Sequence, residues 1–226
     1  METAVAFLAA AGATGFAFDL GRDAVRRARP HVVAYAIGMA MFAIATWALA
    51  LALAWGWSEL LYKIFFLFGA VLNILYLALG SFYLVIGPRT GRVFQGFLAV
   101  FTAMAVIVII SATVVFLPQE GIPSSRDSFE IGLPFIFALL GGIVGTTVLV
   151  ALGIVSIFRF RKTNPRLVWA NVLIVTGVAA AASRGTVLAF VGEGGGFAIS
   201  LLAAVILIWW GYRVASGARR PVSADS

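Results

Sequence analysis

The sequence is poor in the residues on which most cofactor and catalytic sites depend. It has no cysteine among its 226 residues and only one histidine, His31. Without cysteine the chain can form no disulfide, no thiolate metal site and no cysteine nucleophile. A single histidine cannot supply a bis-histidine haem or the His-Glu-x-x-His motif of a metalloprotease. We therefore predict that the chain is not an enzyme and has no metal or other cofactor.

Charged residues are also scarce. They make up 11% of the chain, and hydrophobic residues make up 62%, against about 25% and about 45–50% in soluble domains. This composition excludes an ordinary soluble fold. The net charge of +7 comes from basic residues placed beside apolar runs, which membrane orientation explains. We therefore predict the lipid bilayer as a partner and no nucleic acid.

Seven apolar stretches account for most of the chain. A run of about 20 apolar residues is long enough to cross a bilayer as a helix. The predicted helices span residues 3–20, 32–54, 60–86, 93–117, 132–158, 167–190 and 196–214. The fold class is therefore all-α, a polytopic membrane protein with a single seven-helix domain over residues 1–214. Residues 215–226 form a short tail, too short for an output domain.

The basic residues predict how the chain is oriented. Thirteen of the 16 Lys and Arg residues fall in segments 21–31, 87–92 and 159–166 and in the tail after residue 212. The segments on the other side hold Arg126 alone. Because cytoplasmic loops retain the positive residues, we expect the amino terminus outside and the carboxyl terminus inside a plasma (inner) membrane. The bias toward Ala, Gly, Val and Arg favours a bacterial origin.

Two basic residues fall inside predicted helices, where charge is costly. Lys63 lies near the outer end of its helix, where it can reach water and pair with Glu59 at i,i+4. Arg184 leans toward the membrane centre and needs a partner. It either pairs structurally with Glu59, Glu120 or Glu193, or it holds an anionic ligand.

The helix over 60–86 carries polar and aromatic residues at alternating spacings of three and four. They are Glu59, Tyr62, Phe66, Gly69, Asn73, Tyr76, Gly80 and Tyr83. This spacing places them on one stripe, which is either a packed seam or the wall of a cavity. Asn73, Tyr62 and Tyr76 are thus candidate ligand-binding residues.

Two further features bear on packing and access. Gly141 and Gly145 form a small-xxx-small step of the kind that packs helices in membranes. The polar loop over 118–131 either covers an outward-facing cavity or is a plain connection.

A family resemblance rests on residues 29–92. The segments that carry it are Arg29-Pro30-His31, Gly56-Trp57-Ser58, residues 61–70, Leu72-Asn73, residues 76–80 and Tyr83-Leu84. The sequence of these segments resembles that of uncharacterised seven-transmembrane-helix proteins of actinobacteria. It is more distantly similar to the seven-helix sensory region at the amino terminus of some histidine kinases. The resemblance implies a sensory role, which here needs a separate signalling partner in the cytoplasm or membrane.

We therefore expect a non-catalytic, receptor-like module. It binds a small or lipidic ligand from the outer half of the bilayer, with Arg184 holding an anionic group. One alternative is a small-solute transporter or channel, because a three-plus-one-plus-three transporter would share this orientation. The other alternative is a membrane scaffold or assembly factor, with the Gly141 and Gly145 face against another helix.

Overall fold

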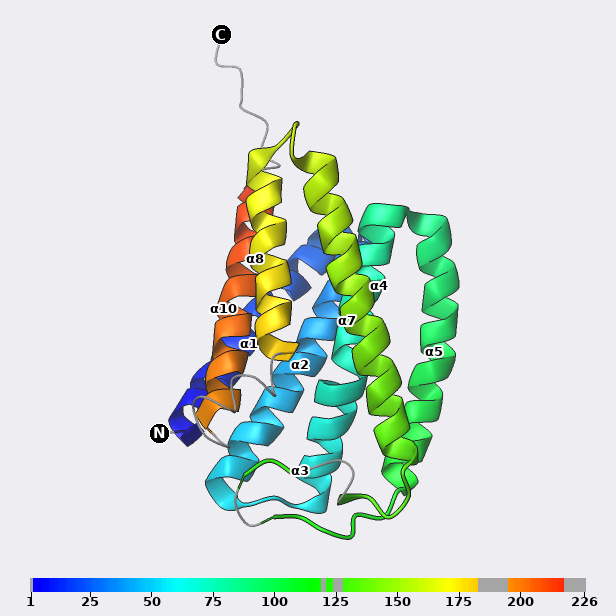
Figure 1. Ribbon diagram of the computed structural model, residues 1–226, viewed down its shortest axis with the longest axis vertical. Helices are drawn as coiled ribbons and strands as arrows, with labels where there is room; N and C mark the ends of the chain where they lie inside the picture. Colours follow the sequence, from blue (N-terminus) through cyan, green and yellow to red (C-terminus); the bar gives the residue numbers. More distant parts are fainter. Residues whose placement is uncertain (1, 119–120, 124–127, 183–194, 218–226) are drawn as a thin grey trace.

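The protein is a bundle of long helices, as the computed structural model shows in Figure 1. The structure describes residues 2–118, 121–123, 128–182 and 195–217. Its helices are α1 (Glu2–Arg27), α2 (Pro30–Trp55), α3 (Glu59–Ile64), η1 (Phe65–Leu72), α4 (Asn73–Ser81), η2 (Phe82–Ile86), α5 (Pro88–Ser111), α7 (Leu133–Phe160), α8 (Pro165–Ala182) and α10 (Gly195–Gly217). The segments from α3 to η2 follow one another without a break and form one membrane-length helix, Glu59–Ile86. We call it the third helix.

Six of these helices are long and apolar enough to cross a membrane. They are α1, α2, the third helix, α5, α7 and α10. The described apolar part of α8, Pro165–Ala181, is shorter, and the rest of the predicted span 167–190 lies outside the described residues. Large hydrophobic side chains such as Phe97, Ile107 and Phe158 are more than 60% exposed on the outside of the bundle. The all-helical fold and these exposed apolar surfaces are those of a multi-pass integral membrane protein.

Six helices form a closed ring. α1 packs on α2, α2 on the third helix, the third helix on α7, α7 on α8, α8 on α10, and α10 returns to α1. α5 lies outside this ring, mainly against the third helix. The fourth helix of the chain is therefore the one that does not surround the interior.

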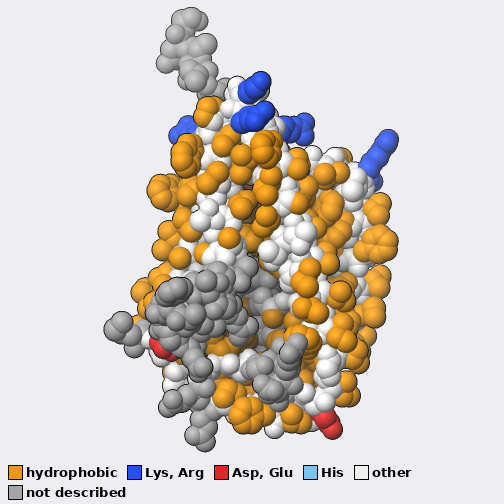
Figure 2. Space-filling view, viewed as in Figure 1, with side chains coloured by type: hydrophobic (Ala, Val, Ile, Leu, Met, Phe, Trp, Pro, Cys, Tyr) orange, Lys and Arg blue, Asp and Glu red, His pale blue; other side chains and the backbone are white. Residues whose placement is uncertain are grey.

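The two ends of the bundle differ in charge. Figure 2 shows Lys and Arg side chains gathered at one end and acidic side chains at the other, with an apolar band between them. The first end carries the connections after α1, after η2 and after α7, together with the last turns of α10. We call it the basic end. The opposite end, which holds the start of α1 and the connection between α5 and α7, is the far end.

The fourth predicted helix, 93–117, is wrong at its carboxyl-terminal boundary, because α5 ends at Ser111. The Ser111 hydroxyl donates to the carbonyl of Ile107 at 2.6 Å, a local bond of the kind that often bends helices. Beyond it Val114 pairs with Phe129 in an isolated antiparallel bridge. Val115 N–H donates to Ser128 at 2.9 Å and Glu130 N–H to Thr113 at 3.1 Å. β-branched residues favour such extended backbone.

The third helix is not a uniform α-helix. η1 and η2 are π-helical, and each i→i+5 turn shifts the residues that follow it around the helix axis. The predicted stripe therefore divides among neighbours. Gly69 and Gly80 lie against Ala45 and Tyr35 of α2, whereas Tyr83 lies against Gly91 of α5. A single seam or a single cavity wall along the whole stripe does not form.

Candidate functional site

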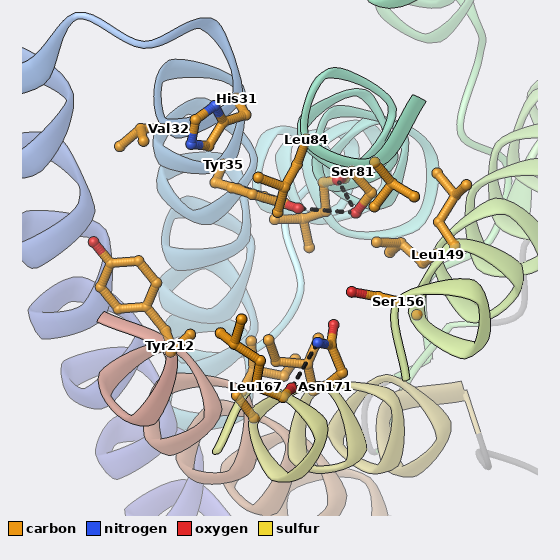
Figure 3. Close-up of a pocket in the computed structure, with 18 of the residues that line it drawn as sticks. His31, Val32, Tyr35, Ser81, Leu84, Leu149, Ser156, Leu167, Asn171 and Tyr212 are labelled. Atoms are coloured by element: carbon orange, nitrogen blue, oxygen red, sulfur yellow. Dashed lines mark hydrogen bonds between the residues drawn. The ribbon is translucent and has the colours of Figure 1, made fainter. Parts of the chain in front are cut away.

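A cavity of about 290 Å³ opens at the basic end of the ring. Residues of α1, α2, α4, η2, α7, α8 and α10 line it, and Figure 3 shows side chains from α2, α4, α7, α8 and α10 around its interior. Its deep wall is aliphatic and includes Leu77, Leu149, Leu152, Val178 and Ile208. The volume is at the lower end of the range of small-ligand pockets, roughly 300–1,000 Å³. We call it the basic-end cavity.

Four polar side chains lie between the aliphatic wall and the mouth of this cavity. The Ser156 hydroxyl of α7 points into the space (Figure 3), is only 5% exposed, and has no hydrogen-bond partner in the described part of the chain. Asn171 of α8 donates its Nδ2 to the carbonyl of Leu167 at 2.7 Å, which leaves its side-chain oxygen toward the cavity. The hydroxyls of Tyr35 and Ser81 are 3.0 Å apart and share a hydrogen bond. The Ser156 hydroxyl is therefore a polar group of the cavity wall that a ligand can bind.

The mouth of the cavity is cationic. Arg27 in the last turn of α1 and Arg159 in the last turn of α7 both line it and are exposed. Neither forms an ion pair with a carboxylate of the described residues. His31, in the first turn of α2, lines the same mouth. The carboxylate of Asp23 also lines the cavity and accepts a hydrogen bond from the Tyr212 hydroxyl at 2.5 Å.

The ring is closed beside this mouth by contacts between its first and last helices. Asp19 accepts hydrogen bonds from Trp209 Nε1 at 3.1 Å and from Arg213 at 3.3 Å. The rings of Phe16 and Trp209 stack with their centroids 6.0 Å apart. Asp19 and Asp23 therefore hold α10 against α1.

These features match one class of ligand. An aliphatic wall takes up an apolar chain, and a mouth with two arginines binds an acidic group through charged hydrogen bonds. Within the described residues no group of three or more His, Asp or Glu side chains could hold a metal ion. The cavity has the chemistry to hold an amphiphile with one acidic head.

A second cavity of about 460 Å³ lies toward the far end, and we call it the far-end cavity. Its wall is mostly aliphatic and aromatic, with Thr46, Asn73 and Thr146 as its polar side chains. Thr46 donates to the carbonyls of Phe42 and Ala43 at 3.0 and 2.9 Å. Asn73 is 7% exposed and its Oδ1 accepts from the N–H of Ile74 at 2.6 Å, while no partner for its Nδ2 occurs in the described chain. Pro123, from the connection predicted as a cover or connector, also lines this cavity.

Of the three predicted polar ligand-binding residues on the third helix, Asn73 lines the far-end cavity, whereas Tyr62 and Tyr76 line neither of these two cavities. Tyr62 is fully buried among aromatic rings, 5.9 Å from Trp57, 5.9 Å from Phe66 and 5.2 Å from Phe129. The Tyr76 hydroxyl lies 3.4 Å from Thr102 on α5. Tyr62, Asn73 and Tyr76 thus face three different surroundings. The π-helical η1 separates Tyr62 from the other two, and Asn73 and Tyr76 lie three residues apart in α4 and face different neighbours.

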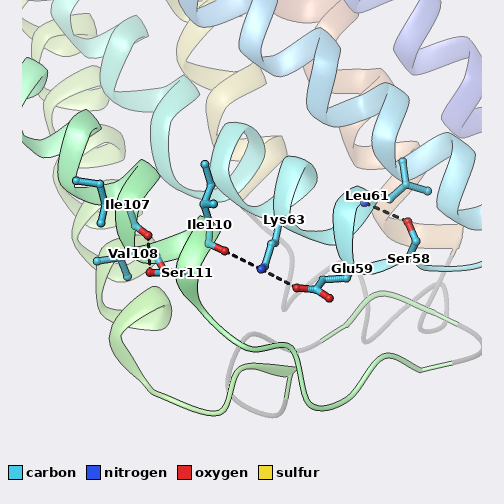
Figure 4. Close-up of polar contacts among 8 residues, drawn as sticks. All are labelled: Ser58, Glu59, Leu61, Lys63, Ile107, Val108, Ile110 and Ser111. Carbon is cyan, nitrogen blue, oxygen red and sulfur yellow. Dashed lines mark hydrogen bonds and ion pairs between the residues drawn. The ribbon is translucent and has the colours of Figure 1, made fainter.

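The predicted anion-binding Arg184 lies outside the described residues, as do its candidate partners Glu120 and Glu193. The third candidate, Glu59, lies 2.7 Å from Lys63, which confirms the predicted i,i+4 pair. Figure 4 shows that Lys63 also donates to the carbonyl of Ile110, at 2.9 Å. That carbonyl is one of the last in α5 and has no partner within the helix. Lys63 therefore joins the start of the third helix to the end of α5.

Gly141 and Gly145 of α7 pack against the third helix. A methyl group on Gly141 would come within 2.5 Å of the carbonyl oxygen of Val71, and one on Gly145 within 2.6 Å of the Ile74 side chain. The small-residue face is thus used inside the chain. A scaffold that binds another protein through this face would have to displace the third helix.

The sequence interpretation missed the polar groups of the basic-end cavity. Thr146, Leu149, Ser156 and Arg159 fall at spacings close to the helical repeat, so they share one face of α7. This spacing was readable in advance, but a single serine between apolar residues is a weak signal, because serine in a helix often bonds its own backbone.

In comparisons with known proteins, no family model, curated protein or solved structure matches the chain. The resemblance to actinobacterial seven-helix proteins and to kinase sensory regions therefore stays a prediction.

Proposed function

We propose that the protein is a non-catalytic, receptor-like membrane module that binds a single-chain amphiphile with an acidic head group. The observation that carries this proposal is the basic-end cavity, which combines an aliphatic wall, the hydroxyl of Ser156 on its inner surface, and a mouth with Arg27 and Arg159. The apolar chain lies along Leu149 and Leu152, and the head group lies at the arginines.

The length of α7 along the cavity suits a ligand whose apolar chain lies deep and whose head group lies at the mouth. Ten residues of α7 separate Leu149 from Arg159, which corresponds to about 15 Å at 1.5 Å per residue. That length accommodates an alkyl chain of medium length with its head at the mouth. The head then meets exposed arginines at an interface, where their charge needs little desolvation.

The proposal includes the topology that the sequence predicts. In it α8 continues into a seventh span, the amino terminus is outside, and the basic end faces the cytoplasm of a plasma membrane. The charge difference between the two ends supports this orientation. The site then opens toward the cytoplasmic interface, in contrast to the outer-half site that Arg184 suggested.

A receptor-like role requires that ligand binding changes the surface that a signalling partner contacts. A ligand shifts a conformational equilibrium only if it binds one state more tightly than the other. Here the head group joins the end of α1 to the end of α7 through Arg27 and Arg159. Binding would therefore change the spacing of the basic connections, the surface available to a separate signalling partner.

The test is binding of decane-1-sulfonate, a permanently charged single-chain anion, to the protein in nanodiscs of neutral lipid. Hydrogen bonds to charged groups contribute about 1.5–3 kcal/mol, so Arg159→Gln should weaken binding by about tenfold. The matched control is Arg161→Gln, because Arg161 lies over the Phe158 ring and does not line the cavity. It should leave the affinity unchanged.

The uncharged analogue decan-1-ol separates head-group recognition from apolar binding. Its affinity should not change in Arg159→Gln. Equal losses of sulfonate affinity in Arg159→Gln and Arg161→Gln would contradict the proposal, since they would reflect general attraction of an anion to a basic surface.

A further inference from the structure

The two cavities are separated by a single layer of side chains. Five residues line both of them: Met39 of α2, Leu77 of α4, Leu149 of α7, Val178 of α8 and Ile208 of α10. Each comes from a different helix of the ring. The basic-end and far-end cavities therefore meet at this layer, which we call the apolar layer.

The apolar layer is packed shut. Leu149 and Val178 are buried in one cluster with Leu77 and Ile208 against it. Leu77 and Ile208 also pack against the cluster that contains Met39. All five side chains thus meet across the interior of the ring, and all are apolar. A constriction of this kind excludes water and ions.

Hydrogen-bond donors lie on both sides of the layer. Along α7, Thr146 lines only the far-end cavity, Leu149 lines both, and Ser156 and Arg159 line only the basic-end cavity. On the far side the amide of Asn73, which lines the far-end cavity, offers a further donor, its Nδ2. An acidic head group would find neutral donors on one side of the layer and cationic donors on the other.

We infer that the two cavities form one passage through the ring, that the apolar layer is its gate, and that a single-chain organic anion crosses there. This inference rests on the proposed ligand class and adds an activity, movement of the ligand between the two ends. The layer matches an alkyl chain in polarity, so the chain can enter it, whereas the head group passes only when the five side chains separate.

Two of the helices that carry the apolar layer, α8 and α10, pack closely on each other. A methyl group on Gly177 of α8 would come within 2.6 Å of Ile208, and one on Gly211 of α10 within 2.7 Å of the carbonyl of Ala170. α8 and α10 therefore form a close pair that carries Val178 and Ile208 together. Displacement of such a pair against α2 and α4 opens a central layer, in the manner of rocking bundles in transporters.

The test is entry of radiolabelled decane-1-sulfonate into sealed liposomes that contain the full-length protein. Leu149→Ala removes a side chain of the gate. Leu75→Ala is the matched control, since Leu75 has similar burial, 5% against 7%, but packs toward α5 and lines neither cavity. We expect Leu149→Ala to raise the rate of entry severalfold over Leu75→Ala. Equal rates in the two variants overturn the inference.

A second measurement covers the case in which Leu149→Ala does not fold. Because the chain has no cysteine, Thr146→Cys and Ser156→Cys each introduce one thiol, on opposite sides of Leu149. A membrane-impermeant thiosulfonate reagent should modify the two cysteines from opposite sides of the liposome, and bound decane-1-sulfonate should slow both reactions. Modification of both from the same side would overturn the passage.

The two proposals fail in different ways. If decane-1-sulfonate binds with the Arg159 dependence given above but Leu149→Ala and Leu75→Ala admit it equally, the protein is a receptor without a passage. If the binding itself lacks that dependence, the ligand class is wrong and the proposed function fails with it.

Discussion

The two cavities lie in one ring of helices but offer a ligand different partners. At the far end Thr46 bonds to carbonyls of its own helix and Asn73 retains only a neutral amide donor. At the basic end Ser156 has no partner within the described chain, and Arg27 and Arg159 have no carboxylate there. The two exposed arginines at the mouth of the basic-end cavity therefore distinguish it from the far-end cavity, whose polar side chains are neutral.

The difference extends to how the two ends are held together. An aromatic cluster of Trp57, Tyr62, Phe66 and Phe129 closes the far end, with ring centroids between 5.1 and 5.9 Å apart. The basic end is closed by polar contacts of Asp19 and Asp23 with α10. We therefore expect stability to depend mostly on the far end and anion binding on the basic end.

The largest effect is expected from Phe129→Ala. Phe129 is 4% exposed and fixes the connection after α5 onto the third helix, and large-to-small changes of this kind cost about 3–5 kcal/mol. Thermal unfolding in detergent should show the loss, while decane-1-sulfonate binding to the folded protein stays unchanged. Phe158→Ala, at a 61% exposed position of the basic end, is the control and should have little effect. A loss of anion binding in Phe129→Ala would show that the two ends are coupled.

An intermediate effect is expected where α7 meets the π-helical part of the third helix. A methyl group on Gly141 would lie 2.5 Å from the Val71 carbonyl oxygen, whereas nothing lies within 4 Å of one on Gly142. Gly141→Ala should cost about 1–3 kcal/mol through overpacking. Gly142→Ala should be neutral or slightly stabilising, since alanine has the higher helix propensity. Equal thermal shifts in the two variants would mean that α7 and the third helix are not in close contact.

The helical fold was largely predictable from the sequence because it depends on local quantities. Apolar length and the placement of Arg and Lys need no tertiary information, and the helices fall where those runs are. The end of α5 was not predictable in this way. Residues 112–117 are as apolar as a membrane span, and only their pairing with the chain near Phe129 makes them extended.

The candidate site was much less predictable than the fold. The interpretation of Tyr62, Asn73 and Tyr76 assumed a constant period along the third helix, and the π-helical turns break that period. The basic-end cavity depends on the return of α10 to α1 and on the exclusion of α5 from the ring, which are tertiary facts. Ser156 and Arg159 share a face of α7, but Arg27 comes from α1, so no local pattern joins it to the other two.

The smallest predicted effect concerns the ion pair at each end. Lys63 is 16% exposed and binds both Glu59 and the carbonyl of Ile110, whereas Arg213, at 67% exposed, binds Asp19 alone at 3.3 Å. Exposed pairs contribute about 0.2–1 kcal/mol and are screened by salt.

Lys63→Gln should therefore lower the free energy of unfolding by somewhat less than about 1 kcal/mol, and Arg213→Gln should lower it by less again. Both are measured by unfolding at low and at high salt. The Arg213→Gln loss should disappear at high salt. Most of the Lys63→Gln loss should persist, because the Ile110 carbonyl at the end of α5 is left without its donor. A larger loss in Arg213→Gln would reverse the comparison and mean that polar contacts, rather than the aromatic cluster, hold the ring closed.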